Sequence, residues 1–388
     1  LLQRIRKQSP GGAVADLSAA DYIGALIGGL AFPFLLLPLF GQLRGVVVVG
    51  AVNAVAGLLL VFTVFRGDVG RRGRWTLIPS AIAVSALLVG CYAYADRFEA
   101  SAQQALFAHP IVYQEHTDYQ QIVMTESISP FGDDDLRLFL NGDLQFSSVD
   151  EYRYHESLVH PAMSGDRSDV LVLGGGDGLA LREVLRYPDV DSATLVELDP
   201  AMTELGRTHP KLAELNENAF DDPRVDVVNA DAFKWLEQQD AGAYDVIVVD
   251  MPDPDSTTTA KLYSVEFYGM AASVLADSGR MSIQSGSPYF APKSFWCVNE
   301  TVAEAGLEAV PYQASVPSFG DWGFHLAAKD AAPQLRIDAP TPPRYLDEAT
   351  LAASSVFPAD RAKLDVPAST VLDPVIMEYA RSEWRSGA

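Results

Sequence analysis

Cysteine and basic residues are both scarce in this sequence. Of 388 residues only two are cysteine, and Cys91 and Cys297 lie in very different contexts. This excludes a disulfide framework and gives no indication of a zinc site or another metal site. Lysine and arginine number 28 against 51 acidic residues, a formal net charge of -23. Because an acidic surface repels phosphate, this balance argues against nucleic acid as a partner and favours a cationic small molecule, although an ordinary solvated acidic surface gives the same balance.

Charge is absent from three long apolar runs near the start of the chain. They cover residues 22–40, 46–65 and 75–95, and each is long enough to span a hydrocarbon core as a helix. Buried core helices are the weaker interpretation, because three such runs follow one another with arginine in the loops between them. We therefore expect residues 1–98 to form the transmembrane region of a multi-pass cell-membrane protein, with the lipid bilayer as a partner.

The side of the membrane on which the rest of the chain lies stays open. The positive-inside rule places the basic start and the arginine-rich loop at residues 66–74 in the cytoplasm, so the segment after Ala95 would lie outside. A substrate made in the cytoplasm requires the opposite orientation. The first residue is leucine, and no signal peptide with a cleavage site is recognisable, which allows a fragment or a processed form of a longer protein.

Two further patterns follow the apolar runs. Residues 99–150 are typical of a helical linker and a small antiparallel β domain with an Asn-Gly hairpin turn. Residues 151–330 alternate apolar strands with helices, which predicts an α/β fold with a mostly parallel sheet covered on both faces. The expected strands are 170–173, 193–196, 225–228, 246–249, 281–284 and 324–328. Residues 331–388 form a tail rich in proline and alanine, with one expected helix at 374–384.

A glycine-rich turn ends the first of these strands. The sequence VLVLGGGDG covers residues 170–178, and the next strand ends in Glu197, about 20 residues after Asp177. Such a turn lets the backbone approach a nucleoside closely, and an acid at the tip of the next strand can accept hydrogen bonds from both ribose hydroxyls. An ordinary turn of an α/β fold is the weaker interpretation, since both motifs occur in order. We expect a nucleoside-containing ligand at this edge of the sheet.

Eight motifs between residues 113 and 328 together resemble the spermidine synthase (polyamine aminopropyltransferase) family. They are DYQQI at 118–122, LNGDLQ at 140–145, DEYRYHE at 150–156, GGGDG at 174–178, VELD at 196–199, DDPR at 221–224, DAF at 231–233 and VVDMPDPD at 248–255. With its apolar runs the chain is similar to the membrane-fused subset of that family. The resemblance implies a Rossmann-like sheet of the class I methyltransferase type, and it allows a homo-oligomer.

The resemblance also implies the reaction. Members of this family transfer an aminopropyl group from decarboxylated S-adenosylmethionine to putrescine or a related amine, giving spermidine and methylthioadenosine. The donor is a co-substrate, so no tightly bound cofactor and no metal are expected. The protein deprotonates the attacking amine, aligns it with the carbon–sulfur bond and excludes water.

The same resemblance assigns roles to residues. Asp250 is the general base, Asp177 binds the donor ammonium, Glu197 the ribose hydroxyls and Asp253 an acceptor ammonium. The expected donor contacts are Gln120, Gly174, Gly176, Asp177, Glu197, Asp231 and Ala232, and the expected acceptor contacts are Tyr154, His155, Asp253 and Phe319. Purely structural roles are the alternatives for three of them: a helix cap for Asp231, a satisfied helix residue for His155 and a core position for Tyr154.

The acceptor side departs from the family pattern. Residues 256–257 replace a Gly-Pro turn, residues 285–287 lack an acid that many members carry, and Phe319 stands where a tyrosine is expected. The amine is therefore open, and two other functions remain. One is an S-adenosylmethionine-dependent methyltransferase, which Asp177 disfavours because it would repel the donor carboxylate. The other is a non-catalytic membrane sensor or transporter for a polyamine or nucleoside, which the altered acceptor side and the apolar runs favour.

Overall fold

The chain divides into two units, residues 1–108 and 109–388, which are described separately. The structure is a computed structural model and describes residues 10–63, 70–127 and 134–386. The basic start of the chain, the end of the second apolar run and Arg66 lie outside the described residues. The finer domain boundaries expected from the sequence stay predictions.

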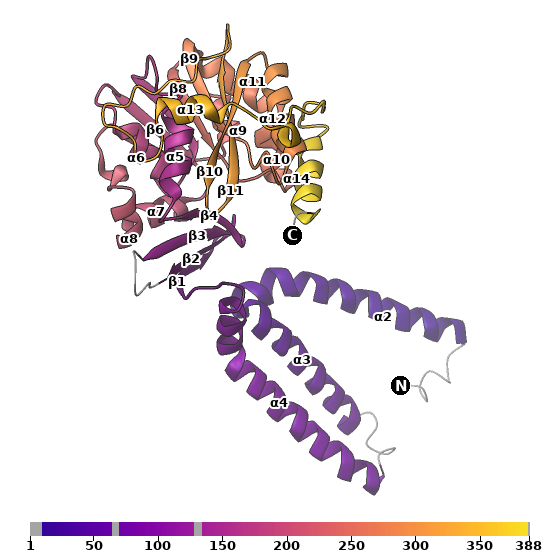
Figure 1. The fold of residues 1–388 in the computed structure, drawn as a ribbon. Helices are drawn as coiled ribbons and strands as arrows, with labels where there is room; N and C mark the ends of the chain where they lie inside the picture. The colour runs from indigo at the N-terminus through magenta and orange to yellow at the C-terminus, as the bar shows by residue number, and fades with distance from the viewer. Residues whose placement is uncertain (1–9, 64–69, 128–133, 387–388) are drawn as a thin grey trace. The chain divides into compact units, whose positions relative to one another are not determined.

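The first unit consists of long helices (Figure 1). They are α2 (Pro10–Ala31), the π-helical turn η1 (Phe32–Leu36), α3 (Leu37–Thr63) and α4 (Arg71–Gln104). The π-turn contains Pro33, whose ring nitrogen cannot donate a helical hydrogen bond. Three stretches, Ser18–Gly41, Leu43–Thr63 and Trp75–Gln104, are long and apolar enough to cross a membrane. The three expected apolar helices are thereby confirmed, and the third continues beyond the predicted end.

Helices α3 and α4 contact each other within this unit. The Cδ2 atom of Leu88 lies 3.2 Å from where a Cβ on Gly50 would sit, so the small residue permits the close approach. An ion pair of 2.5 Å joins Arg44 to Asp96, and the Arg44 guanidinium also lies over the Tyr92 ring. Large apolar side chains elsewhere on these helices are exposed, which suits hydrocarbon surroundings rather than water.

The second unit begins with a four-stranded antiparallel sheet whose strands follow one another in sequence order. Its strands are β1 (Ile111–His116), β2 (Gln121–Ser127), β3 (Asp135–Leu140) and β4 (Asp143–Ser147). The turn from β3 to β4 holds Asn141 at φ 54° and Gly142 at φ 97°. Both values lie in the left-handed region that a tight hairpin turn requires, which explains the Asn-Gly pair.

A seven-stranded sheet forms the centre of the second unit. Its strands are β5 (Asp169–Gly174), β6 (Ser192–Glu197), β7 (Val225–Asn229), β8 (Tyr244–Asp250), β9 (Leu275–Gln284), β10 (Glu308–Val316) and β11 (Gly320–Ala328). Their order is β10-β11-β9-β8-β5-β6-β7. Strand β11 pairs antiparallel with both of its neighbours, β10 and β9, and all other neighbouring pairs are parallel. This confirms the expected Rossmann-like α/β fold.

Helices cover both faces of this sheet (Figure 1). Val170 and Val172 of β5 face a core with α5 (Glu151–Val159), α6 (Leu179–Leu185) and α13 (Glu348–Ser354). Leu171 and Leu173 face the other core, with α9 (Ala232–Leu236), α10 (Thr257–Ala260), α11 (Val265–Val274), α12 (Pro292–Glu304) and α14 (Val375–Ser386). The alternation follows the two-residue period of a strand. Because β5 to β9 are parallel, their carboxyl ends meet at one edge of the sheet.

The remaining elements are short, and two features were not expected. Helices α7 (Pro200–Thr208) and α8 (Pro210–Leu215) and the 3₁₀ turns Ala219–Asp221, Lys261–Tyr263 and Ala359–Arg361 complete the unit. Strand β10 was missed because it contains Pro311, although Val310, Tyr312, Ala314 and Val316 alternate along it; it lies at the sheet edge, where proline is tolerated. The tail holds α13 besides the expected helix near its end, and the Asp347 side chain caps α13 through Thr350 N.

Candidate active site

The glycine turn lies against the ends of two neighbouring strands. Gly174 has φ +83°, and a Cβ there would lie 2.1 Å from the Asp250 carbonyl oxygen at the end of β8. A Cβ on Gly176 would lie 2.8 Å from Cγ of Glu197 at the end of β6. Neither position therefore tolerates a side chain without a shift of its surroundings. The two glycines bring Asp250, the turn and Glu197 together at the carboxyl edge of the sheet.

Two carboxylates lie on the β6 side of the turn, Asp177 buried and Glu197 partly buried. Asp177 is 8% exposed and accepts a hydrogen bond of 2.9 Å from Leu179 N. Glu197 accepts one of 2.9 Å from Asp199 N. Burial raises the pKa of Asp177 to about 6 and that of Glu197 to about 7. No lysine or arginine of the described residues forms an ion pair with either carboxylate, so this side suits a ligand that brings positive charge or hydroxyl donors.

The outer residues of this side also have structural contacts. Asp231 caps α9 by accepting a bond of 3.1 Å from Phe233 N, and it pairs with Lys261 at 2.7 Å. Burial would raise the pKa of Asp231, but the hydrogen bond and charge of Lys261 outweigh burial and lower it. Ala232 next to it is buried. The Gln120 amide donates to Asp199 Oδ2 at 3.0 Å, so Gln120 reaches this side through Asp199.

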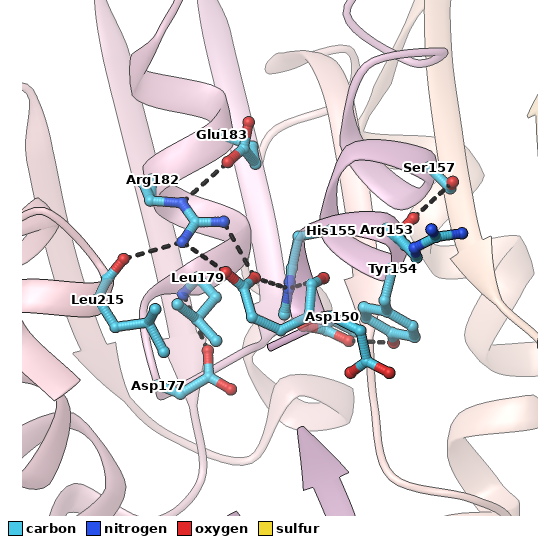
Figure 2. Close-up of polar contacts among 12 residues, drawn as sticks. Asp150, Arg153, Tyr154, His155, Ser157, Asp177, Leu179, Arg182, Glu183 and Leu215 are labelled. Atoms are coloured by element: carbon cyan, nitrogen blue, oxygen red, sulfur yellow. Dashed lines mark hydrogen bonds and ion pairs between the residues drawn. The ribbon is translucent and has the colours of Figure 1, made fainter. Parts of the chain in front are cut away.

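Asp250 lies between the two sides of the site and is held by Tyr154. The Tyr154 hydroxyl donates a hydrogen bond of 2.6 Å to Asp250 Oδ1, and Figure 2 shows the ring of Tyr154 beside His155 on the same helix. Burial raises the pKa of Asp250, against the opposing charge of His155 and the bond from Tyr154. A carboxylate with a raised pKa in a fixed orientation can accept a proton near neutral pH.

The β9 side of Asp250 is mostly aromatic. The Tyr154, Phe319 and Trp322 rings surround one space, with centroids 6.2 Å apart for Tyr154 and Phe319 and 5.1 Å for Phe319 and Trp322. Asp253 is the carboxylate here, and burial raises its pKa to about 6. Its Oδ1 lies 3.8 Å from where a Cβ on Gly286 would sit.

Sequence reasoning expected Trp322 close to Phe319 without giving it a role, and it missed Gln284 as a site residue. The Gln284 amide donates bonds of 2.5 Å to Met251 O and to the Tyr263 hydroxyl, and its carbonyl accepts one of 3.2 Å from Trp322 Nε1. This neutral side chain lies at the end of β9. Through its bonds to Met251 and Trp322 it holds the segment after Asp250 and the Trp322 ring in place. The contact joins residues that are remote in sequence, and no local motif indicates it.

A buried ion network supports the site from α5 and α6 (Figure 2). His155 Nδ1 lies 2.9 Å from the Glu151 carbonyl and 2.8 Å from Glu151 Oε2. Arg182 binds both oxygens of Glu151, at 2.9 and 3.0 Å, and also reaches Glu183 Oε1 at 2.8 Å. Sequence reasoning missed Glu151 and Arg182; the four-residue spacing of Glu151 and His155 on one helix was the available signal.

No metal centre is visible in the part of the chain that the structure describes. Within residues 10–63, 70–127 and 134–386, no group of three or more histidine, cysteine, aspartate or glutamate side chains is arranged to hold a metal ion. The expectation of a metal-free site stays a prediction. Asp177, Glu197 and Asp250 lie at the ends of three different strands rather than in one cluster.

The fold and the site define a class of enzymes, those that bind a nucleoside-containing molecule at the carboxyl edge of a Rossmann-like sheet. The spermine/spermidine synthase domain matches residues 151–338. Polyamine aminopropyltransferase 1 of Streptomyces coelicolor is 56% identical over 387 residues, covering 99% of this chain and 73% of the relative. The polyamine aminopropyltransferase of Mycobacterium tuberculosis is 44% identical over 392 residues, with 99% and 73% covered.

Two solved structures agree with these relatives. A spermidine synthase in complex with the transition state analogue AdoDATO has a TM-score of 0.58 and 27% identity, covering 64% of this chain and 85% of that chain. The spermidine synthase from Thermotoga maritima has a TM-score of 0.56 and 26% identity, with 64% and 84% covered. The chain therefore belongs to the spermine/spermidine synthase family. The sequence prediction of an aminopropyltransferase of this family is confirmed.

Proposed function

We propose that this chain transfers the aminopropyl group of decarboxylated S-adenosylmethionine to an amine such as putrescine, and releases methylthioadenosine. The observation that carries the proposal is the Asp177 carboxylate, buried in the glycine turn and not paired with any lysine or arginine of the described residues. It would attract the ammonium of the decarboxylated donor and repel the carboxylate of ordinary S-adenosylmethionine. It therefore favours aminopropyl transfer over methyl transfer. The names of the relatives support the same activity.

The β6 side would hold the donor. Glu197 would accept hydrogen bonds from the ribose hydroxyls, and the backbone at Gly174 and Gly176 would lie against the nucleoside. Asp231 with Ala232 would contact the adenine amine, since Asp231 lies after β7, the next strand along the edge. Gln120 would act beside them through its bond to Asp199.

Asp250 would act as the general base. The acceptor ammonium gives a proton to the Asp250 carboxylate, and the freed lone pair of nitrogen forms a bond to the aminopropyl carbon. The carbon–sulfur bond breaks, and its electron pair converts the sulfonium into the neutral thioether of methylthioadenosine. The hydrogen bond from Tyr154 would hold the carboxylate in line with the attacking nitrogen.

The β9 side would hold the acceptor. Asp253 would pair with an ammonium, and the Tyr154 and Phe319 rings would contact the carbon chain and the cation. His155 lies beside Tyr154, with ring centroids 4.9 Å apart, and completes this wall. The aromatic surroundings fit a small aliphatic amine.

The three apolar helices would span the cell membrane, with the lipid bilayer as their partner. The charge pattern predicts that the unit after Ala95 lies outside, whereas a cytoplasmic donor supply predicts the inside. Reporters placed after Ala95 and in the loop at residues 66–74 decide between them, because a cytoplasmic signal after Ala95 reverses the charge-based orientation. A homo-oligomer, which the family resemblance implies, is tested by the mass of the detergent-solubilised protein.

The activity is tested directly by incubation with decarboxylated S-adenosylmethionine and a panel of amines. We expect methylthioadenosine to form with at least one short aliphatic amine, and ordinary S-adenosylmethionine to give no methylated product. The Asp250→Asn variant should lose the activity while it still binds the donor. If no amine gives methylthioadenosine and the variant behaves like the parent, the chain is a binding protein rather than an enzyme.

A further inference from the structure

His155 is a buried basic side chain among acids. It is 2% exposed, and it lies on α5 next to Tyr154, which holds Asp250. The Asp177 carboxylate, on the glycine turn, and Asp250, at the end of β8, both act on its charge. A protonated imidazole at this position would be a fixed positive charge inside a site built for positively charged molecules.

Glu151 fixes which nitrogen of this ring can gain or lose a proton. His155 Nδ1 lies within hydrogen-bond distance of two oxygens of Glu151, 2.9 Å from its carbonyl and 2.8 Å from Oε2. Both are acceptors, so Nδ1 carries a hydrogen whether the ring is neutral or charged. The titrating atom is therefore Nε2. Figure 2 shows the His155 ring upright between the ion network around Arg182 and the Tyr154 ring.

The ion network beside His155 holds two arginines and three carboxylates. Glu151 and Glu183 pair with Arg182 and Arg186 at 2.7 to 3.0 Å, and Arg186 also pairs with the mostly exposed Glu217 at 3.1 Å. Besides Glu151, the charges that favour a proton on His155 Nε2 are those of Asp177 and Asp250, which lie outside the network. A second histidine, His160, contacts Glu183 on the far side of the network at 3.3 Å.

The electrostatics agree with this geometry. Burial disfavours the charged ring, but the hydrogen bond and charge of Glu151, followed by the charges of Asp177 and Asp250, outweigh burial and raise the pKa of His155. In return, the charge of His155 lowers the pKa of Asp177 and of Asp250, against the effect of their burial. The imidazolium therefore favours the ionised form of both carboxylates while the site is empty.

We propose that His155 is an imidazolium in the free enzyme, where it stands in for a missing substrate cation, and that binding of the cationic donor expels its Nε2 proton to solvent. This rests on the proposed function, which supplies a donor with a sulfonium and an ammonium. These two charges replace the imidazolium as partners of the acids. Glu151 stays ionised because Arg182 holds both of its oxygens. His155 is then neutral in the complex and acts as a positioning residue.

The experiment counts protons released on binding by titration calorimetry in buffers of different ionisation enthalpy, between about pH 6 and pH 9. Decarboxylated S-adenosylmethionine is compared with methylthioadenosine, a neutral ligand that lacks the aminopropyl group. The proteins are the parent, His155→Gln and a control, His209→Gln. His209 lies outside the site, beside Tyr113, and burial lowers its pKa, so the control replaces one neutral side chain by another.

Asp177, Glu197, Asp250 and Asp253 also have raised pKa values and release protons when the donor binds. Because the His155 charge lowers the pKa of Asp177 and Asp250, its loss in His155→Gln increases the release from these two acids, and the difference between parent and variant is a lower bound on the His155 proton. We expect the parent and His209→Gln to release up to about one proton more than His155→Gln with the cationic donor at the upper end of the pH range, where fewer carboxylates are protonated. With methylthioadenosine all three should agree. Release by His155→Gln that equals or exceeds that of the parent at every pH overturns the proposal.

Nuclear magnetic resonance of the parent protein provides a second check, which does not depend on any substitution. The His155 ring nitrogens should show a charged ring in the free enzyme and a neutral one, with hydrogen on Nδ1, after the donor binds. A ring that is neutral in the free enzyme also overturns the proposal, even where His155→Gln fails to fold. A donor that does not bind at all contradicts the proposed function instead, so the two failures are distinguishable.

Discussion

The donor half and the acceptor half of the proposed site are built in different ways. The centre of the donor half comes from one short stretch, residues 174–197, in which backbone and carboxylates meet at the ends of β5 and β6, and Gln120, Asp231 and Ala232 lie around it. The acceptor half gathers side chains from α5, the loop after β8, the end of β9 and β11. A half made of backbone is fixed by the fold, whereas a half made of side chains can change its ligand while the fold is kept.

The two halves also differ in electrostatics. The donor half holds the buried Asp177 and the partly buried Glu197, and both carboxylates have raised pKa values. The acceptor half has Asp253, three aromatic rings and the neutral Gln284 at the end of β9. Charge therefore selects the donor, and shape and ring contacts decide more of the choice of amine. Substitutions in the two halves should then change different kinetic constants.

The largest effect is expected at Asp250, which belongs to both halves. Asp250→Asn removes the proton acceptor, so kcat should fall about 10²- to 10⁴-fold, the usual contribution of a general base. Donor affinity should stay within a few-fold of the parent, measured by calorimetry beside the release of methylthioadenosine. Asp245→Asn is the matched control, because Asp245 lies at the other end of β8 and contacts Asp169 N. Full activity of Asp250→Asn would show that Asp250 is not the general base.

A smaller effect confined to the donor is expected for Asp177→Asn. The neutral amide cannot pair with the donor ammonium, so the donor Kd should rise about 10- to 100-fold, the loss of a charged hydrogen bond. The amine KM should change little. An equal loss of amine affinity would show that the two halves are not separable. Calorimetry with the donor and kinetics with the amine measure the two effects.

The same substitution should stabilise the protein, with a defined pH dependence. Burial raises the folded-state pKa of Asp177 from 3.8 to about 6, so the folded chain disfavours the ionised form. Above about pH 6 the parent carries this penalty in full, and Asp177→Asn should be more stable by on the order of 3 kcal/mol. As the pH falls from 6 towards 4, the folded parent gains the proton and the difference disappears. Thermal unfolding in detergent at several pH values measures it.

The donor half could be predicted from the sequence because its determinants are local. A strand, a turn that needs glycine at Gly174 and an acid at the next strand end follow one another within a few turns of chain. The Asn141-Gly142 hairpin was predictable for the same reason, since two positive φ values select that pair. Local backbone conformations that only certain residues adopt can therefore be recognised from the residue type.

The contacts that sequence reasoning missed depend on tertiary structure. Arg182 meets Glu151 across two helices, and Trp322 meets Gln284 across two strands, and neither spacing carries a periodic signal. Strand β10 was missed because of Pro311, which an edge strand tolerates and a central strand does not. The acceptor half consists mainly of such contacts, which explains why the resemblance left its amine open.

A change of amine preference, with the donor unaffected, is expected for Trp322→Ala. The substitution opens the space beside Tyr154 and Phe319 and removes the bond to Gln284, so kcat/KM for the best short amine should fall about tenfold. Longer amines should gain relative to it, and the donor Kd should stay unchanged. Trp235→Ala is the control, because Trp235 lies on α9 against Tyr244. If the amines keep the same order of kcat/KM, the Trp322 ring does not determine amine specificity.

The smallest effect is expected for Phe319→Tyr, which adds one hydroxyl to the acceptor half. Phe319 packs on Trp322 and faces Tyr154, whose hydroxyl binds Asp250, so the new hydroxyl adds a polar group to the aromatic wall of the acceptor half. One added hydrogen bond should lower the KM of a diamine about two- to tenfold. A monoamine of the same length, which has no second polar end, is the internal control and should keep its KM. If both amines improve equally, the ring acts through packing alone, and shape rather than polarity distinguishes the acceptor half from the donor half.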